Sequence, residues 1–537
     1  MKLNPTRIIC SRLLLLSIAA VLVAAASAQD KPAVKLDPSS MPKLGTVDPR
    51  YLSYNIEMVE VTGGRFWKPY NAPPASNAEK SATPPNPNQP VGLDSNMFQY
   101  RQPIDLANPR LRKLAQALGP SYVRVSGTWA NSTYFQDDDN PAAAQVPTGF
   151  KTVLTRAEWK AVIDFARAAN AQIVTSVAIS DGTRNDEGVW SSDQAKALFA
   201  YTKRVGGAIA ASEFMNEPTF PGPGGAPKGY DATMFGRDAK VFESFLRKES
   251  PKTIFLGPGS VGEGISLSPP GMAMQITLLK SDDLLKATGP IFDAFSYHFY
   301  GTVSRRCGGK LTIDQALSPD WLDRTDTVEA FYATLRDRYL PGKPMWLNET
   351  AEAACGGDPF AGQFVDAFRF LNQLGTLAQK GVKVVMHNTL AASDYSLLTN
   401  DTFQPKPDFW AAVLWKQTMG TTVLNSGSTF DPALRIYAQC AKAAKDGVTL
   451  LVLNTDKNEK RSIVLPAAAE RYTLTSDALD STSVSLNGTA LEVAPDGSLP
   501  QISGQPVNAG TVSLDAQSIT FLTISAARNK SCQGISR

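Results

Sequence analysis

The chain has few histidines and only a small excess of basic residues. Only two of its 537 residues are histidines, His298 and His387, and neither a Cys-x-x-Cys nor a His-Glu-x-x-His spacing occurs. Zinc sites are usually built from such patterns, so we expect no metal and no bound cofactor. Basic residues outnumber acidic ones by only three, which argues against a nucleic-acid partner or a basic membrane-binding surface.

Long apolar runs are missing beyond the first 28 residues. Lys2, Arg7 and Arg12 precede an apolar stretch over residues 13–26, and Ala26-Ser27-Ala28 has the form of a cleavage site. This pattern predicts a Sec-type signal peptide over residues 1–28, and therefore a periplasmic or extracellular protein. A membrane anchor is the alternative, but the stretch is short and no later one reaches the ~20 apolar residues of a span. Cleavage would remove three basic residues and no acidic one, so the formal net charge would fall from +3 to 0.

Cysteines are few as well. Of the five, Cys10 lies in the signal peptide, and Cys307, Cys355, Cys440 and Cys532 remain in the exported chain. Disulfides form and persist in an oxidising compartment, so these four residues are expected to supply up to two of them.

Eight short runs with the character of buried strands follow one another, separated by segments with helical spacing of apolar residues. Strand followed by helix, repeated eight times, is the pattern of a (β/α)8 TIM barrel, an α/β fold. We assign the barrel to residues 51–420, after a Pro-rich lead segment over residues 29–50. The eight runs are residues 51–61, 121–127, 171–179, 211–217, 252–257, 294–300, 343–349 and 382–388.

Three of the expected helices carry start signals. Asn108 suits an N-cap, and Thr155 with Glu158, like Ser191 with Gln194, has the spacing of a capping box. Further helices are predicted over residues 232–248, 272–287, 325–339, 362–380 and 407–419.

From residue 421 the pattern changes to short alternating runs with turns between them. Strands are expected over residues 434–438, 448–453, 462–465, 484–493 and 519–525, with an Asn487-Gly488 hairpin turn inside the fourth. Residues 421–537 are therefore predicted to form an all-β sandwich domain. Its role is either to support the barrel or to bind substrate, and support is the commoner one.

Two glutamates end apolar runs in matching settings, Glu217 after Met215-Asn216 and Glu349 after Leu347-Asn348. Residues at the C-terminal ends of barrel strands point into the active site, and strands four and seven lie on opposite walls. Two carboxyl groups that face each other across a cleft are the equipment for cleaving a glycosidic bond. Asn-Glu-Pro alone would be weak support, whereas the two placements together favour Glu217 and Glu349 as catalytic residues.

Other polar positions have less specific explanations. His298 and Tyr300 close the sixth strand, where contact with the substrate or a catalytic carboxylate is as reasonable as a core role. The Gly-x-Gly-x-x-Gly match at residues 257–262 precedes no helix and is read as a loop. Glu352 is expected beyond its strand in a solvated or helix-capping role, and residues 137–139, three aspartates, in an exposed loop without the pattern of a calcium site.

Taken in order, these segments resemble glycoside hydrolase family 79, which contains heparanase and bacterial β-glucuronidases. Residues 114–128 are similar to the family's second strand, residues 214–218 to its acid/base motif, and residues 346–350 with Cys355-Gly356-Gly357 to its nucleophile strand and glycine loop. The resemblance continues through Asp394-Tyr395 and covers almost the whole mature chain, ending with residues 407–410, 434–437, Cys440 and Cys532.

The resemblance implies a retaining enzyme with Glu217 as the acid/base and Glu349 as the nucleophile. It implies that Asn216 binds the sugar 2-hydroxyl, and that the backbone amides of Gly356 and Gly357, with the hydroxyl of Tyr395, receive a glucuronate carboxylate. It also implies a Cys440–Cys532 disulfide. A Cys307–Cys355 disulfide is a further expectation, because both cysteines follow strand ends on one face of the barrel.

Two departures from heparanase bear on the substrate. Residues 136–150 are too short for the segment that heparanase loses on maturation, which favours a single-chain enzyme. Residues 261–265 lack the basic residues expected for sulfated chains, and only Arg305-Arg306 is obviously basic nearby. The sequence favours an exported β-glucuronidase acting on glucuronic-acid-containing oligo- or polysaccharides. The alternatives are a heparanase-like endo-β-glucuronidase of glycosaminoglycans and a carbohydrate-binding barrel without activity.

Overall fold

The computed structural model describes residues 32–71, 90, 93–143, 145–265, 278–428 and 431–533. The predicted signal peptide lies outside these residues. None of the helices within them is long and apolar enough to cross a membrane.

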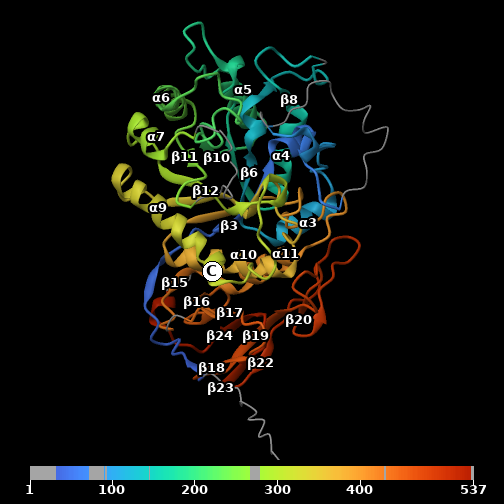
Figure 1. Ribbon diagram of the computed structural model, residues 1–537, viewed down its shortest axis with the longest axis vertical. Coiled ribbons are helices and arrows are strands. Elements are labelled where there is room, and N and C mark those ends of the chain that lie inside the picture. Colours follow the sequence, from blue (N-terminus) through green and yellow to red (C-terminus); the bar gives the residue numbers. More distant parts are fainter. Residues whose placement is uncertain are drawn as a thin grey trace, which may run out of the picture. The chain divides into compact units, whose positions relative to one another are not determined.

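Eight parallel strands close into a barrel (Figure 1), as the strand–helix repeat predicts. Each expected run contributes one strand, although most boundaries differ by a few residues. The strands are β3 (Leu52–Glu57), β6 (Ser121–Ser126), β9 (Ala171–Ser176), β10 (Ile209–Glu213), β11 (Ile254–Ser260), β12 (Ala294–Val303), β13 (Met345–Ala354) and β14 (Val384–His387).

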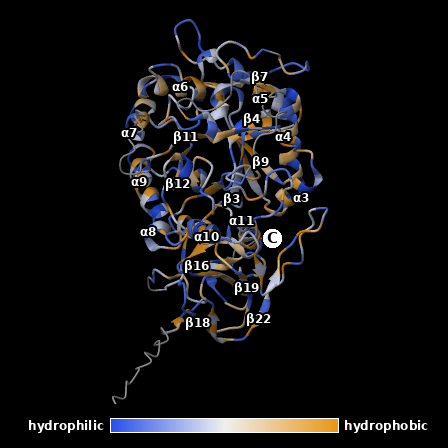
Figure 2. Ribbon diagram, turned by 45° about the vertical axis from the view of Figure 1, so that its right-hand side comes forward, coloured by the Kyte–Doolittle hydropathy of each residue, from blue (hydrophilic) through white to orange (hydrophobic). Residues whose placement is uncertain are grey.

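Helices surround the barrel. Most bury one face against the strands, whereas the last two, residues 364–379 and 407–418, are buried on nearly every side. Helix α4, for example, buries Trp159, Ile163 and Phe165 and leaves polar residues outside, so Figure 2 shows both colours on the same ribbon. The helices are α3 (Pro109–Ala117), α4 (Arg156–Ala168), α5 (Asp193–Arg204), α6 (Ala232–Glu249), α7 (Ser281–Thr288), α8 (Pro319–Leu322), α9 (Arg324–Tyr339), α10 (Phe364–Gln379) and α11 (Pro407–Thr418).

Two local expectations are wrong, and a third concerns a segment that is only partly described. The first strand ends at Glu57 and not at residue 61, because Glu57 and Glu60 form the capping box that starts helix α1 (Met58–Thr62). The expected box at Ser191 and Gln194 does not form, since Oε1 of Gln194 accepts from the Phe135 amide at 2.6 Å. The helix predicted over residues 272–287 is described from Ser281 onward, and residues 272–277 lie outside the described part.

The interior of the barrel is layered. An apolar layer fills its N-terminal part, formed by Tyr122, Val174, Ala211, Leu256, Ala294, Trp346, Val384 and Met386. Side chains two residues further along a strand share the same face, so Arg124 and Glu213 stand one layer above Tyr122 and Ala211. The barrel is thus sealed by apolar residues below and carries buried polar groups towards its C-terminal end.

The second part of the chain is an all-β sandwich, as expected, but it also includes residues near the N-terminus. In the lead segment β1 (Val34–Lys35) pairs with β18, and β2 (Lys43–Thr46) pairs with β15. The other strands are β15 (Met419–Leu424), β16 (Leu434–Ala441), β17 (Val448–Asn454), β18 (Arg461–Leu465), β19 (Ala469–Thr475), β20 (Ser485–Leu486), β21 (Thr489–Ala490), β22 (Gln505–Val507), β23 (Gly510–Leu514) and β24 (Ser518–Ile524).

Helix α10 joins the sandwich to the barrel. Its first amides, those of Phe364 and Val365, donate to carbonyls of the sandwich at 2.9 Å. Further along, the hydroxyl of Tyr437 on β16 donates to Oδ1 of Asn372 at 2.7 Å. A Cβ at Gly375 would lie 2.3 Å from the Tyr437 ring, so glycine is what allows this close approach.

Two further pairs of strands flank the barrel. Strands β4 (Gly64–Trp67) and β5 (Phe98–Arg101) are antiparallel, and β7 (Thr133–Gln136) and β8 (Thr152–Thr155) are parallel. The first pair matters for the site, because it carries Trp67 to the rim of the pocket.

Candidate active site

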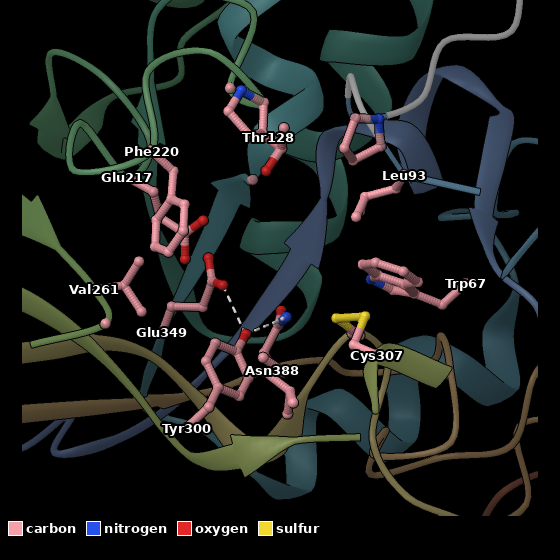
Figure 3. A pocket seen from close by; sticks show the side chains of 18 of the residues that line it. Trp67, Leu93, Thr128, Glu217, Phe220, Val261, Tyr300, Cys307, Glu349 and Asn388 are labelled. Carbon is pink, nitrogen blue, oxygen red and sulfur yellow. Dashed lines mark hydrogen bonds between the residues drawn. A yellow bond between two sulfur atoms is a disulfide. The ribbon is translucent and has the colours of Figure 1, made fainter. Parts of the chain in front are cut away.

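Glu217 and Glu349 face the same pocket from different strand positions than the sequence predicts (Figure 3). Strand β10 already ends at Glu213, and Glu217 lies in the following turn with a positive φ of 50°. Glu349 is the fifth residue of β13, which continues to Ala354 beside the equally long β12. Both glutamates were expected to be the last residues of their strands, which is wrong, but both reach the predicted site.

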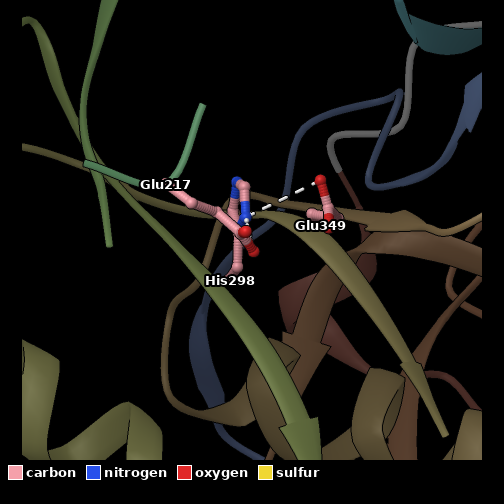
Figure 4. A group of neighbouring side chains, drawn as sticks. All are labelled: Glu217, His298 and Glu349. Atoms are coloured by element: carbon pink, nitrogen blue, oxygen red, sulfur yellow. Dashed lines mark hydrogen bonds and ion pairs between the residues drawn. The ribbon is translucent and has the colours of Figure 1, made fainter. Parts of the chain in front are cut away.

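The two carboxylates and His298 form a compact cluster (Figure 4). One oxygen of Glu217, one of Glu349 and a ring nitrogen of His298 all lie within 4.8 Å of one another. Nδ1 of His298 is 3.1 Å from Oε1 of Glu217 and 3.6 Å from Oε2 of Glu349. The imidazole therefore bridges the two glutamates from below the pocket.

Arg124 anchors this cluster from the barrel interior. Its guanidinium donates to Oε2 of Glu213 and to Oε2 of Glu349, both at 2.7 Å, and to Oδ1 of Asn216 at 2.8 Å. Glu213 also accepts from the side-chain amide of Asn348 at 2.5 Å. Charge-assisted bonds of this kind fix side-chain orientation strongly in a buried setting.

The two glutamates have opposite electrostatic settings. Burial dominates at Glu217 and raises its pKa above the usual value, even though the bond to His298 lowers it. Burial would raise the pKa of Glu349 too, but His298, Arg124 and the hydroxyl of Tyr300 outweigh it, so that pKa is lowered. One carboxyl is thus set to carry a proton while the other is set to be ionised, the division of roles expected of an acid and a nucleophile.

The carboxylates around His298 favour its protonated form. Burial alone would lower its pKa, but the charge of Glu349 and the bonds to Glu213 and Glu217 raise it to about 9. A protonated imidazole has no lone pair to offer a cation, so the cluster's chemistry suits hydrogen bonding better than metal binding.

Tyr300 and Tyr395 complete the floor of the pocket. The hydroxyl of Tyr300 donates to Oε1 of Glu349 at 2.7 Å. Nδ2 of Asn388 lies 3.1 Å from both tyrosine hydroxyls and from Oε1 of Glu57, and its two hydrogens serve two of these three oxygens at a time. No described residue accepts a hydrogen bond from the Tyr395 hydroxyl, so its proton is available to a group bound in the pocket.

Four of the predicted substrate contacts, Asn216, His298, Gly356 and Gly357, are not among the residues that line the pocket, whereas Ala354 and Cys355 are. The amide of Gly357 donates to the Ala353 carbonyl at 3.1 Å, so it would have to exchange that partner for a ligand. Asn216 likewise faces Arg124 from a buried position next to Glu217.

The glycine loop, residues 355–358, is held from several sides. Its backbone carbonyls at Cys355 and Gly357 accept from the guanidinium of Arg306 at 2.8 and 3.0 Å. The same guanidinium pairs with Asp394 and lies 3.9 Å from the ring centre of Tyr70. Arg306 is therefore fully engaged in supporting the loop and is not a free cation for sulfated substrates.

Both expected disulfides are present. Cys307–Cys355 joins the loop after β12 to the glycine loop, and its two cysteines line the pocket. Cys440–Cys532 lies in the core of the sandwich.

Two of the less specific assignments need correction, and one is confirmed. Glu352 lies inside β13, is buried, and accepts from the Asp358 amide at 3.0 Å, because the strand runs on past Glu349. Residues 257–260 belong to β11 and not to a loop. Residues 137–139 are exposed, as expected, and Asp137 and Asp139 pair with Arg156.

Arg124, Glu57 and Asn388 belong to the site but were not predicted from the sequence. Glu57 lines the pocket and accepts from Asn388 at 3.1 Å, and burial together with the charge of Glu349 raises its pKa well above the usual value. A signal existed for the two charged residues. Arg124 interrupts the apolar run of the second strand, and Glu57 ends the first strand as a carboxylate.

Comparison with known proteins identifies the family. A sequence model of the N-terminal domain of glycosyl hydrolase family 79 matches residues 102–375. The chain belongs to glycoside hydrolase family 79. The matched residues include both Glu217 and Glu349.

Curated relatives match about four fifths of this chain. Heparanase of Mus musculus is 27% identical over 488 residues, which cover 80% of this chain and 88% of the relative. Hyaluronoglucuronidase of Hirudo nipponia is 24% identical over 486 residues, 82% of this chain and 95% of the relative.

The fold is also found among solved structures. A 4-O-α-L-rhamnosyl-β-D-glucuronidase from Fusarium oxysporum superposes with a TM-score of 0.61 at 12% identity, covering 91% of this chain and all of the other. At that identity the likeness concerns the fold.

Proposed function

We propose that this family 79 glycosidase is an exported, retaining β-glucuronidase that releases β-linked glucuronic acid from oligo- or polysaccharides. The observation that carries the proposal is the pair of carboxylates, with oxygens within 4.8 Å of each other. Retaining glycosidases hold their two carboxyl groups about 5 Å apart, whereas inverting enzymes leave room for a water between them. Export rests on the signal-peptide pattern and agrees with the two disulfides.

The reaction would proceed by two displacements. Glu349, ionised and oriented by Arg124 and Tyr300, attacks the anomeric carbon while Glu217 gives its proton to the leaving oxygen. The bond from sugar to leaving group breaks, and a glycosyl ester forms on Glu349. Glu217, now a carboxylate, then takes a proton from water, which displaces Glu349 and restores the original configuration.

Azide rescue tests the assignment of the two glutamates. Glu217→Ala should still be glycosylated by an aryl β-glucuronide with a good leaving group, and should then stall because hydrolysis lacks its base. Azide needs no general base, so it should restore turnover and give a β-glucuronosyl azide, identified by NMR. Glu349→Gln should be inactive on every substrate and unaffected by azide. An α-azide from Glu217→Ala, or inverted sugar from the wild type, would overturn the assignment.

Selectivity for glucuronate is proposed to come from neutral donors, with Tyr395 foremost. Loss of the hydroxyl in Tyr395→Phe should cost about 1–3 kcal/mol in kcat/KM on aryl β-glucuronides, the usual range for a hydrogen bond to an ion. Hydrolysis of the matching aryl β-glucosides should change little. Equal losses on both would show that Tyr395 only supports the fold around Asn388.

A heparanase-like endo mode is the second candidate. It is favoured by the names of the relatives, which act as heparanase or hyaluronoglucuronidase. Product analysis on a panel of glucuronate-containing glycans separates the two modes, because an exo enzyme releases the monosaccharide from the start and an endo enzyme first produces oligomers. Absence of turnover on every glucuronide would instead favour a binding protein.

A further inference from the structure

The wall of the pocket beside Glu217 is apolar. Phe220 follows Glu217 in the same turn, and Val261 follows the neighbouring strand β11; Figure 3 shows both side chains next to the Glu217 carboxylate. Phe220 is only partly buried, so its ring is available to a ligand. Pro223 and Leu278 also line the pocket, and the amide of Leu279, next to Leu278, donates to the carbonyl of Thr219, next to Phe220, at 3.1 Å.

Leu278 adds an independent observation. It is 40% exposed and is one of only three large hydrophobic residues exposed to this degree in the described part of the chain, with Leu44 and Val146. Of the three, Leu278 alone lines the pocket, which has a volume of about 360 Å³. Apolar side chains left open at the rim of a pocket usually mark a surface that a ligand covers.

The charges in the pocket also favour an uncharged leaving group. Among the described residues that line it, the ionisable carboxylates are Glu57, Glu217 and Glu349, and there is no lysine, arginine or histidine. A sulfated or carboxylated leaving group would meet no cation there, and the ionised Glu349 adds a negative charge to the pocket. Arg306, the nearest basic candidate from the sequence, is committed to the glycine loop.

The position of this wall relative to the acid decides which part of a substrate it meets. Glu217 gives its proton to the oxygen of the leaving group, so the leaving group must lie against the side chains that flank Glu217. Glu349, Tyr300 and Tyr395 belong to the opposite, sugar-binding part of the pocket. An aromatic ring such as Phe220 offers its face to another planar ring at low entropic cost.

We propose that Phe220, Val261 and Leu278 form an apolar leaving-group subsite that favours uncharged aglycones, so that uncharged aryl β-glucuronides are substrates beside the glucuronide glycans of the proposed function. The inference rests on the proposed β-glucuronidase function and adds a second substrate class to it. A sulfated or otherwise charged leaving group is the competing occupant.

Kinetics with matched aglycones test the subsite in the full-length protein. The 2-naphthyl β-glucuronide and its 6-sulfonate present the same ring system, with and without a charge. The wild type should hydrolyse the uncharged compound with a kcat/KM at least tenfold higher than that of the sulfonate. Equal or reversed preferences would overturn the subsite while leaving the β-glucuronidase function intact. No hydrolysis of any β-glucuronide would instead overturn the function.

Variants of Phe220 test whether its side chain contacts the leaving group. Phe220→Ala should lower kcat/KM on the naphthyl substrate about tenfold and change methyl β-glucuronide less than twofold, and Phe220→Leu should restore most of the loss. Val146→Ser alters an exposed apolar residue away from the pocket and serves as the control. An equal loss on both substrates would contradict a leaving-group role.

Inhibition constants measured on the wild type test the subsite without any variant, so the result does not depend on whether a variant folds. The 2-naphthyl 1-thio-β-glucuronide should inhibit at least tenfold more tightly than the methyl thioglycoside, both measured against methyl β-glucuronide. Equal inhibition constants would refute the subsite.

Discussion

Arg124 shows how much of the site depends on one side chain. It is fully buried, and its guanidinium serves Glu213, Glu349 and Asn216 at once. Burying charges is costly, and the cost is offset only while every charge keeps its partner. Substitutions in this charged cluster are therefore expected to lower the stability of the barrel as well as the activity.

Removing Arg124 should destabilise the protein strongly. Arg124→Met leaves Glu213 buried without its cation, and the loss of one partner of a buried pair costs about 3–5 kcal/mol. Urea unfolding should show a loss in this range. The double variant Arg124→Met/Glu213→Gln removes both charges and should recover part of it. A double variant as unstable as the sum of the single ones would mean that the two residues do not act as a pair.

The pH profile should reflect the opposite shifts of the two glutamates. Glu217 must hold a proton, so kcat/KM should fall as pH rises through its raised pKa. Glu349 must be ionised, so kcat/KM should fall as pH drops through its lowered pKa. The two limbs report apparent values of the coupled pair.

His298→Gln should move both limbs in the same direction. The imidazolium lowers the pKa of Glu217 and of Glu349, so a neutral replacement should raise both and shift the whole profile to higher pH. The profile of kcat/KM on an aryl β-glucuronide gives the measurement. A profile that only loses height, with unchanged limbs, would show that His298 orients the glutamates without setting their charge.

The meeting of Glu217 and Glu349 in one pocket could be predicted from the sequence, because the C-terminal strand ends of a barrel converge. Arg124 and Glu57 could not be assigned in the same way. Whether a charged residue in an apolar strand pairs inside the barrel or faces a helix depends on strand register, and an error of one residue reverses the answer. Glu57 was also concealed by helix α1, whose apolar residues extend the strand pattern to residue 61.

At the scale of elements, the glycine loop is the part of the site with the most supports. A disulfide, the Arg306 guanidinium and the bond between Glu352 and the Asp358 amide all fix it. The disulfide was expected from the sequence. The roles of Arg306 and Glu352 were not, because Arg306 comes from a separate segment and Glu352 reaches the loop only because β13 continues past Glu349.

The two disulfides should differ in their effect on activity. Cys307→Ser/Cys355→Ser frees a loop on the pocket wall, so it should raise KM on glucuronides as well as lower stability. Cys440→Ser/Cys532→Ser is the matched control in the sandwich and should lower stability with KM unchanged. Either loss should lie near 2–4 kcal/mol, the usual range for a disulfide. Thermal unfolding and steady-state kinetics on the same preparations separate the two outcomes, and an unchanged KM in the first variant would argue against a role for the loop.

At the scale of the whole molecule, the eightfold alternation of strands and helices predicted the barrel well, because each repeat carries its own pattern. The sandwich was predicted only as a class. Strands β19 and β23 have short or mixed patterns, and the participation of β1 and β2 is a long-range pairing that no local pattern encodes.

That long-range pairing sets an order of events for the growing chain. Strand β2 is made early, yet its partner β15 and the partner of β1, β18, follow roughly 400 residues later. At the usual rate of synthesis, 5–20 residues per second, the first strands wait about 20–80 s for them. Asn529, close to the other end, then donates to the carbonyls of Pro38 and Met41 at 2.7 and 2.9 Å. The sandwich is thus completed last, and its earliest residues spend most of the time of synthesis without a partner.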